Sequence, residues 1–223
     1  MFVHRLFVCT IGWTETPIVR LVVRHGLKAG DFVLLIKPIG ADEKAEVALR
    51  SIEDFLIKML GDLALRSFRV LEIDPLALVN SIKQIKEVLE GYEAEEIVAI
   101  LSGGMRALLL ETLLGLFFSK HFQKERRTVI EVDLEGRNEY IKLDSRLLKL
   151  IGWKPAREQL KLVEALKFEP KTMRQLAEEL GVNVSTIYRW YKDLEARGLI
   201  TAEKDGHSKA VKLKLTELSS LIA

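Results

Sequence analysis

The 223-residue chain has little of what disulfide-rich, metal-binding or membrane proteins need. Cys9 is its only cysteine, which excludes an internal disulfide and is typical of a reducing compartment. The four histidines lack the short spacings of metal ligands, so we expect neither a metal nor a cofactor. The longest apolar stretch, Leu108–Phe118, is too short to span a bilayer and contains Glu111. Because the first residues also lack a signal-peptide layout, we expect a cytoplasmic protein with no membrane partner.

Two common nucleotide-binding fingerprints are missing as well. No G-x-G-x-x-G follows the first predicted strand, and no G-x-x-x-x-G-K-[ST] occurs anywhere in the chain. The glycines of these motifs let the backbone approach a pyrophosphate or a triphosphate, and the lysine side chain binds the phosphates. Their absence argues against a dinucleotide-dependent oxidoreductase and against a P-loop ATPase.

Charge is nearly balanced, with a formal net charge of +2. Residues 154–223 carry 13 Lys and Arg against 10 Asp and Glu, whereas residues 1–153 carry 21 against 22. This mild asymmetry permits nucleic-acid binding by the C-terminal part without requiring it.

Residues 1–144 alternate β-branched runs with helical patterns, which predicts an α/β domain built on a mostly parallel sheet. The predicted strands are Phe2–Thr10, Phe32–Lys37, Phe68–Ile73, Ile97–Leu101, Thr128–Leu134 and Glu139–Leu143. The predicted helices are Thr16–Gly26, Asp42–Leu60, Pro75–Glu90 and Gly104–Phe122. A turn over Glu135–Asn138 joins the last two strands, so we expect the final strand to be antiparallel.

Residues 155–223 follow a different pattern, that of three helices and a hairpin. The first helix has an apolar face formed by Leu160, Val163, Leu166 and Phe168. The second begins at a Thr172 cap and stops at Gly181, and the third covers Val184–Arg197 with Asn183 placed to cap it. A polar turn, Lys204–Lys209, precedes a returning strand at Ala210–Leu215. This spacing predicts a winged helix-turn-helix.

Residues 145–154 form a connector between these two domains. Its segment Ser145–Trp153 is apolar and is predicted to be helical rather than flexible. Its large apolar side chains would be costly to leave in water, so we expect them to pack on a domain or on a second subunit. They are Leu147, Leu148, Leu150, Ile151 and Trp153.

The winged helix predicts double-stranded DNA as a partner, because the third helix presents polar and basic side chains suited to the major groove. The residues expected at DNA are Asn183, Ser185, Thr186, Tyr188, Arg189 and Lys192 on or before this helix, with His207 and Lys209 on the wing. An alternative stays open, since some winged helices only bind proteins. Tyr188, Trp190 and Tyr191 would also suit packing against another subunit.

Two unusual loops follow the first and fourth strands of the first domain. In the common strand order 3-2-1-4-5 these strands are neighbours at the point where ligands bind. Glycines, hydroxyls and a cation at the start of a helix suit a phosphorylated ligand. The candidate ligand residues are Thr10, Gly12, Trp13, Thr14, Ser102, Gly103, Gly104, Met105 and Arg106. The plain alternative is that Ser102–Gly104 is only a tight strand-to-helix turn.

These loops, with their T-x-G-x-T and S-G-G-x-R patterns, resemble those of CARF domains, the CRISPR-associated Rossmann fold. Together with the winged helix, nearly the whole chain resembles the archaeal CARF–winged-helix transcriptional regulators. The resemblance implies a Rossmann-like sensor that dimerises and binds cyclic oligoadenylate, here cyclic tetra-adenylate, at the residues just named. It implies a non-enzymatic regulator of a CRISPR system in antiviral defence. Met105 departs from the family, which often has a polar residue there.

Two other functions remain as alternatives. One is a ring nuclease that cleaves its own cyclic oligonucleotide, with Arg106 positioning the ring, and the other is a non-catalytic scaffold that docks on a protein complex. The R-x-x-x-x-H spacing of Arg20 and His25 matches ribonuclease domains often fused to such sensors. It lies in the first helix of the sensor itself, so we expect a chance match and no catalytic residue.

Overall fold

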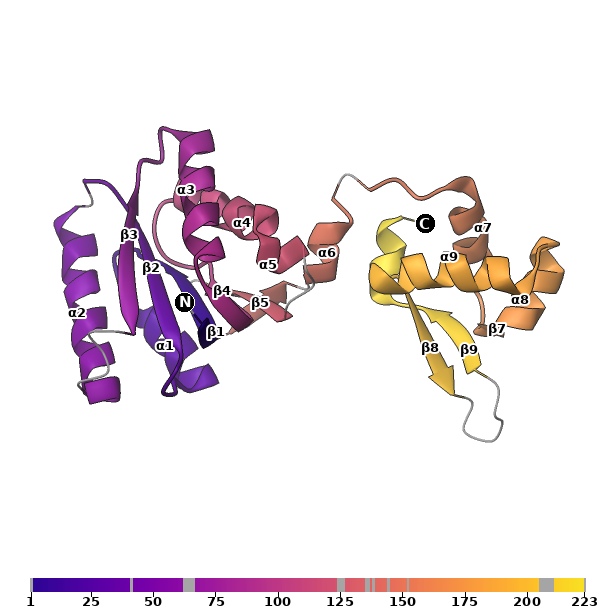
Figure 1. Cartoon of the computed structure of the whole chain (residues 1–223), viewed down its shortest axis with the longest axis horizontal. Helices are drawn as coiled ribbons and strands as arrows, with labels where there is room; N and C mark the ends of the chain where they lie inside the picture. Colours follow the sequence, from indigo (N-terminus) through magenta and orange to yellow (C-terminus); the bar gives the residue numbers. More distant parts are fainter. Residues whose placement is uncertain are drawn as a thin grey trace. The chain divides into compact units, whose positions relative to one another are not determined.

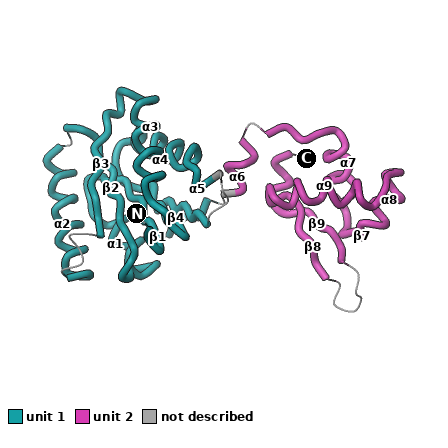
Figure 2. Tube along the Cα trace, in the orientation of Figure 1, with its two compact units in different colours: residues 1–145 teal, residues 146–223 magenta. Residues whose placement is uncertain are grey.

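The computed structural model (Figure 1) describes residues 2–40, 42–61, 67–123, 127–134, 137, 139–143, 145–151, 153–204 and 211–222. The chain divides into two compact units, Met1–Ser145 and Arg146–Ala223, which Figure 2 shows in separate colours. Each unit has an apolar core of its own. In the described part of the chain, no helix combines the length and apolar character that crossing a membrane requires.

The first unit is built on a six-stranded sheet with the order β3-β2-β1-β4-β5-β6. Its strands are β1 (Phe2–Thr10), β2 (Phe32–Pro38), β3 (Phe68–Ile73), β4 (Glu93–Ile100), β5 (Arg127–Asp133) and β6 (Tyr140–Leu143). The first five are parallel and β6 is antiparallel to β5, as predicted. β4 begins four residues earlier than expected, because Glu93 and Ala94 pair in register with Phe2 and Val3 despite the acidic sequence there.

Helices cover both faces of this sheet. They are α1 (Thr16–His25), α2 (Glu43–Leu60), α3 (Leu78–Glu90), α4 (Arg106–Phe118) and α5 (Lys120–Gln123). Phe7 and Cys9 of β1 share a buried cluster with Ile18 of α1 and Ile52 of α2. Because side chains alternate along a strand, the even-numbered residues of β1 point to the other face, where α3 and α4 pack on each other.

Two predicted helices of this unit need correction. The segment predicted as one helix over Gly104–Phe122 is two helices, because Ser119 is extended and its hydroxyl donates to the carbonyl oxygen of Leu116, 2.7 Å away. α3 begins at Leu78 rather than Pro75. Of the predicted turn Glu135–Asn138, only Arg137 lies within the described residues.

The second unit is a winged helix-turn-helix, as predicted. After α6 (Ser145–Lys149), its elements are α7 (Arg157–Ala165), β7 (Lys171–Thr172), α8 (Met173–Leu180), α9 (Val184–Ala196), β8 (Ile200–Lys204), β9 (Val211–Leu215) and the 3-10 helix η2 (Glu217–Leu221). β7, β9 and β8 form a small antiparallel sheet in that order.

The turn between α8 and α9 explains why this sequence forms a helix-turn-helix. The hydroxyl oxygen of Thr172 accepts from the backbone nitrogen of Gln175 and caps the start of α8. Gly181 ends α8 with a left-handed φ of 65°, which a residue with a Cβ rarely adopts. Leu176, Ile187 and Leu194 are then buried between the helices.

Two expectations for this unit were wrong in detail. Phe168 does not belong to the apolar face of the first helix: α7 ends at Ala165, and Phe168 is 92% exposed. The connector is helical only over Ser145–Lys149 and then turns. Leu150 and Trp153 do pack against the core of the second unit, whereas Ile151 is 69% exposed.

Candidate ligand site and nucleic-acid interface

The two candidate ligand loops lie next to each other, because β1 and β4 are parallel neighbours. Their register pairs Cys9 with Ile100, so both strands end at the same level of the sheet. The strand order also reverses between them, with β2 on the far side of β1 and β5 on the far side of β4. This is the position at which open α/β sheets bind ligands.

The glycines of these loops pack backbone against backbone. A Cβ on Gly12 would lie 2.4 Å from the backbone nitrogen of Gly104, and a Cβ on Gly103 would lie 2.6 Å from the carbonyl oxygen of Thr10. Gly104 also has a φ of 94°, and its Cβ would meet the carbonyl oxygen of Ile11 at 2.4 Å. The glycines are therefore required for the two loops to pack against each other, independently of any role in binding a ligand.

Two helices begin from these loops without side-chain caps. Glu15 precedes α1 and Met105 precedes α4, and neither makes a capping hydrogen bond with its side chain. Neither first turn contains an acidic residue. Arg106, the first residue of α4, is exposed. Helix N-terminal N–H groups without a cap, together with an exposed guanidinium, favour an anionic ligand.

The candidate hydroxyl residues differ in how accessible they are. Thr10 is buried and its hydroxyl donates to the carbonyl oxygen of Ile100 at 3.5 Å. The hydroxyl oxygen of Ser102 accepts from the backbone nitrogen of Asp133 at 2.5 Å. Thr14 is exposed. Thr10 and Ser102 thus already have protein partners, and Thr14 is the hydroxyl most open to a ligand.

Trp13 has partners that the sequence did not indicate. Its indole Nε1 donates to Oδ2 of Asp42 at 2.8 Å, and Nζ of Lys44 lies 5.3 Å from the centre of its ring. The sequence predicts Asp42 only as the start of a helix. A contact between residues 29 positions apart leaves no local pattern in a sequence.

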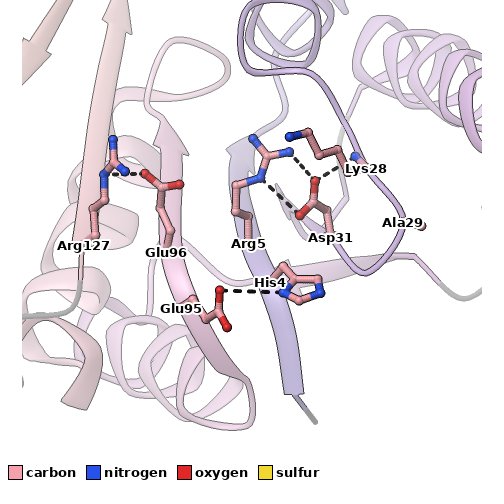
Figure 3. A pocket seen from close by; sticks show the side chains of 8 residues that line it. All are labelled: His4, Arg5, Lys28, Ala29, Asp31, Glu95, Glu96 and Arg127. Atoms are coloured by element: carbon pink, nitrogen blue, oxygen red, sulfur yellow. Dashed lines mark hydrogen bonds and ion pairs between the residues drawn. The ribbon is translucent and has the colours of Figure 1, made fainter.

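A cavity of about 530 Å³ lies at the opposite end of the strands, where β1, β4 and β5 begin (Figure 3). Most of its charged side chains are paired with one another. Arg5 contacts Asp31 at 2.5 Å, Arg127 contacts Glu96 at 2.9 Å, and Nδ1 of His4 lies 3.7 Å from Glu95. The remaining lining residues are Lys28 and Ala29. Opposite charges here are nearly equal in number, so the cavity lacks the positive excess that an anionic ligand needs.

Arg20 and His25 have separate partners. Arg20 donates to the carbonyl oxygen of Arg137 at 3.4 Å, whereas Nε2 of His25 lies 2.9 Å from Oε1 of Glu131. Glu131 is fully buried and also contacts Arg24 at 2.7 Å. These contacts tie α1 to β5, which is a structural role for the histidine.

The residues expected at DNA lie on the exposed side of α9. Ser185, Arg189 and Lys192 are exposed, and Tyr188 is 51% exposed. Asn183 occupies the N-cap position of α9, but its side chain makes no capping hydrogen bond and is exposed. Thr186 is half-buried. His207 and Lys209 on the wing lie outside the described residues.

The aromatic residues of α9 separate into two kinds. Trp190 and Tyr191 pack in the core of their own unit, which leaves Tyr188 as the exposed one. Burial raises the pKa of Tyr191 to about 12, and its hydrogen bond to Glu195 adds to this. Lys192 pairs with Glu195 at 2.7 Å, and hydrogen bonds from Lys192 and Tyr191 lower the pKa of Glu195. Lys192 is therefore less free than Arg189 to reach a phosphate.

Together these features define a class of two-unit protein, in which a Rossmann-like α/β domain is followed by a winged helix-turn-helix. A family model described as the Csa3 CRISPR-associated Rossmann-like domain matches residues 5–144. The chain therefore belongs to the family with the Csa3 CRISPR-associated Rossmann-like domain. A second model, described as HVO_A0114, matches residues 156–219.

Solved structures that are similar to part of this chain include transcriptional regulators. The adhesin competence repressor AdcR of Streptococcus pyogenes is 26% identical, with a TM-score of 0.31, over 34% of this chain and 58% of its own. The regulator Tm0710 of Thermotoga maritima is 30% identical, with a TM-score of 0.30, over 34% of this chain and 54% of its own. The homodimeric DNA-binding domain Mb0332 of Mycobacterium bovis is 18% identical, with a TM-score of 0.29, over 35% of this chain and 69% of its own. This chain thus spans little more than half the length of AdcR and of Tm0710. No curated protein matches this chain.

Proposed function

We propose that the chain is a homodimeric transcriptional regulator of a CRISPR system, in which a CARF domain binds cyclic oligoadenylate and the winged helix binds promoter DNA. Cyclic tetra-adenylate is the ligand that we expect. The regulator acts in the cytoplasm without a cofactor and leaves its ligand intact. Membership in the Csa3 CRISPR-associated family supports the link to CRISPR.

The observation that best supports the proposed ligand is the contact between Gly12 and Gly104. It brings together the loops after β1 and β4, and with them the starts of α1 and α4. Both helix starts lack side-chain caps, and Arg106 adds an exposed cation. Phosphodiester groups are anions that accept hydrogen bonds from such N–H groups. A cyclic oligonucleotide offers several of them in one compact ring.

The outward face of α4 supports a homodimer. Leu110, Leu114 and Phe118 recur every fourth residue and are 59%, 36% and 45% exposed. The neighbouring Leu109, Leu113 and Phe117 are half-buried. A helix that is apolar on all sides belongs in an interior, so this face needs a cover. A second copy fits best, because α4 begins at Arg106 and a two-fold axis beside it would place two equivalent sites around one symmetric ring.

Exposure and charge on α9 support DNA as the partner of the winged helix. Arg189 lies in the N-terminal half of α9 and is free of the carboxylate that holds Lys192. An arginine in this position can donate two hydrogen bonds to a guanine or bind a phosphate. Residues 145–154 then act as the connector, since Leu150 and Trp153 are packed and a packed segment transmits displacement better than a flexible one.

A mobility-shift assay tests this function. Purified protein is mixed with promoter fragments of a CRISPR locus and with random DNA, each with and without cyclic tetra-adenylate. The proposal predicts preference for the promoter and a change in affinity when ligand is added. Equal binding to both DNAs, or no response to ligand, would refute it. Chromatography of the recovered ligand separates a regulator, which returns the intact ring, from a ring nuclease, which returns linear products.

A further inference from the structure

Trp13 is a large aromatic residue that stands out into solvent. It is 69% exposed, although it follows directly on the buried Gly12. An indole ring carries more apolar surface than other side chains, and leaving it in water forgoes the free energy that burial would supply. The indole is therefore not part of the buried core of the described unit.

The ring is nevertheless held in a defined orientation. Its Nε1 donates to Oδ2 of Asp42 at 2.8 Å. The other carboxylate oxygen of Asp42 accepts from the backbone nitrogen of Ala45 at 2.9 Å and caps α2. One carboxylate thus both starts a helix and fixes the edge of the indole. An exposed aromatic side chain fixed in this way is preorganised for a contact, because its rotational entropy is already lost.

The surroundings of the ring favour a nucleotide base as the contact. Lys44 lies in the first turn of α2, and its Nζ is 5.3 Å from the ring centre. On the other side of Trp13 in the sequence, Gly12 packs on Gly104 next to the start of α4. Features suited to phosphate and an open aromatic surface therefore occur within a few residues of each other. In proteins that bind single-stranded nucleic acids, the bases stack on aromatic side chains. Basic residues nearby contact the phosphates of the same strand.

We propose that Trp13 is a stacking platform for a purine base of the bound ligand, and that Asp42 is a positioning residue that holds this platform. The inference rests on the proposed function and adds to it the group that contacts a base of the ligand. Phosphates bind at the helix starts, and the base lies on the indole.

The test combines calorimetry with tryptophan fluorescence on the full chain, using cyclic tetra-adenylate and, as a control, inorganic phosphate. Trp13→Leu removes the stacking surface and should weaken cyclic tetra-adenylate about tenfold. Trp13→Phe keeps an aromatic face without the bond to Asp42 and should weaken it about threefold. Asp42→Asn is the matched variant. The asparagine oxygen can still cap α2, but an N–H group replaces the carboxylate oxygen that accepts from Trp13. This substitution should also cost about threefold and reduce the quenching of Trp13.

The part of the tryptophan emission that is lost in Trp13→Phe comes from Trp13. Its quenching by ligand is the readout that a purely structural role would not change. Cyclic tetra-adenylate should quench this emission in the unsubstituted protein, and phosphate should not. Calorimetric binding with no quenching would overturn the platform while leaving the proposed function intact. No binding to the unsubstituted protein would overturn both. If Trp13→Leu instead converts ligand-free dimers to monomers in sedimentation, the ring is covered by the second subunit, and the platform is overturned.

Discussion

The hydroxyl oxygen of Ser102 accepts a hydrogen bond from the backbone nitrogen of Asp133, 2.5 Å away. The bond joins the loop after β4 to the end of β5. Asp133 in turn contacts Nη2 of Arg24 at 3.4 Å, and the Arg24 guanidinium lies 3.9 Å from the centre of the Tyr140 ring. Tyr140 begins β6, the last strand before the connector. One side-chain network thus links a candidate ligand loop, α1 and the strand that leads toward the second unit.

The contact between the two glycine loops predicts that Gly12→Ala is severe. Its Cβ would meet the backbone nitrogen of Gly104 at 2.4 Å, and a backbone atom cannot move aside without displacing its loop. We expect the free energy of unfolding of the first unit to fall by about 3 kcal/mol. Gly40→Ala is the matched control, because φ there is 67° and nothing lies within 4 Å. That change should cost only about 1 kcal/mol of backbone strain. Urea unfolding curves that shift equally would contradict the account.

Glu111 predicts a pH dependence of stability. It is fully buried in α4, and neither carboxylate oxygen has a hydrogen-bond partner within the described structure. Burial raises the pKa of Glu111, and the nearby Asp74 adds to this. The folded state therefore holds this proton more tightly than the unfolded chain does. Its contribution to stability is complete below the pKa of the unfolded chain and is lost as the pH rises through the higher pKa of the folded state.

Glu111→Gln removes this titration while keeping the shape of the side chain. The free energy of unfolding of Glu111→Gln, relative to that of the unsubstituted protein, should therefore increase as the pH rises through the same interval. Urea unfolding at pH 4 and at pH 7 measures the difference. A difference that is the same at both pH values would show that Glu111 does not titrate in this way.

The apolar face of α4 predicts that a single charge there prevents dimerisation. Leu114→Glu places a carboxylate in the middle of the stripe, where an ion without a partner is costly to bury. We expect monomers in sedimentation velocity at concentrations at which the unsubstituted protein is dimeric. Val47→Glu is the control, since Val47 is 50% exposed on α2, a helix of the other sheet face. Dimers that survive Leu114→Glu but not Val47→Glu would place the interface elsewhere.

Arg189 on α9 predicts how the winged helix contacts DNA. If it donates two hydrogen bonds to a guanine, Arg189→Ala should weaken promoter binding by about 1–3 kcal/mol and relax preference at that base. If it binds a phosphate, affinity should fall equally on all sequences and depend less steeply on salt. Arg50→Ala on α2 serves as the control for loss of one positive charge. Unchanged affinity in a folded Arg189→Ala protein would remove this residue from the interface.

Much of the fold could be predicted because it depends on local patterns. The alternation of strands with helices predicted a mostly parallel sheet, and its strand order is the common one expected for such sheets. The Thr172 and Gly181 signals predicted both ends of α8. Local patterns failed where strand pairing or the end of a helix decides the structure. Glu93 joins β4 because Phe2 lies opposite it, and Phe168 is exposed because α7 stops three residues earlier.

The candidate site was predictable in position but not in its contacts. The loops after β1 and β4 follow from strand order, and Gly12, Gly103 and Gly104 stand out in any sequence. What the glycines do, which is to let the loops touch, requires the coordinates of both loops. The same holds for the bonds from Trp13 to Asp42 and from Asp133 to Ser102, which join residues about 30 positions apart. Such pairs are set by tertiary packing and leave no periodicity.

The proposed coupling between ligand binding at the loops and DNA binding by α9 is tested most directly by a reciprocal titration. Cyclic tetra-adenylate is titrated into the protein alone and into its complex with promoter DNA. Thermodynamic linkage requires that the ratio of the two ligand affinities equal the ratio of DNA affinities with and without ligand. Arg106→Ala should abolish ligand binding and the effect of ligand on DNA while leaving ligand-free DNA binding unchanged. We expect two equal ratios that differ from one. Ligand affinities that are the same with and without DNA would mean that the two units do not communicate, and would contradict the proposed coupling.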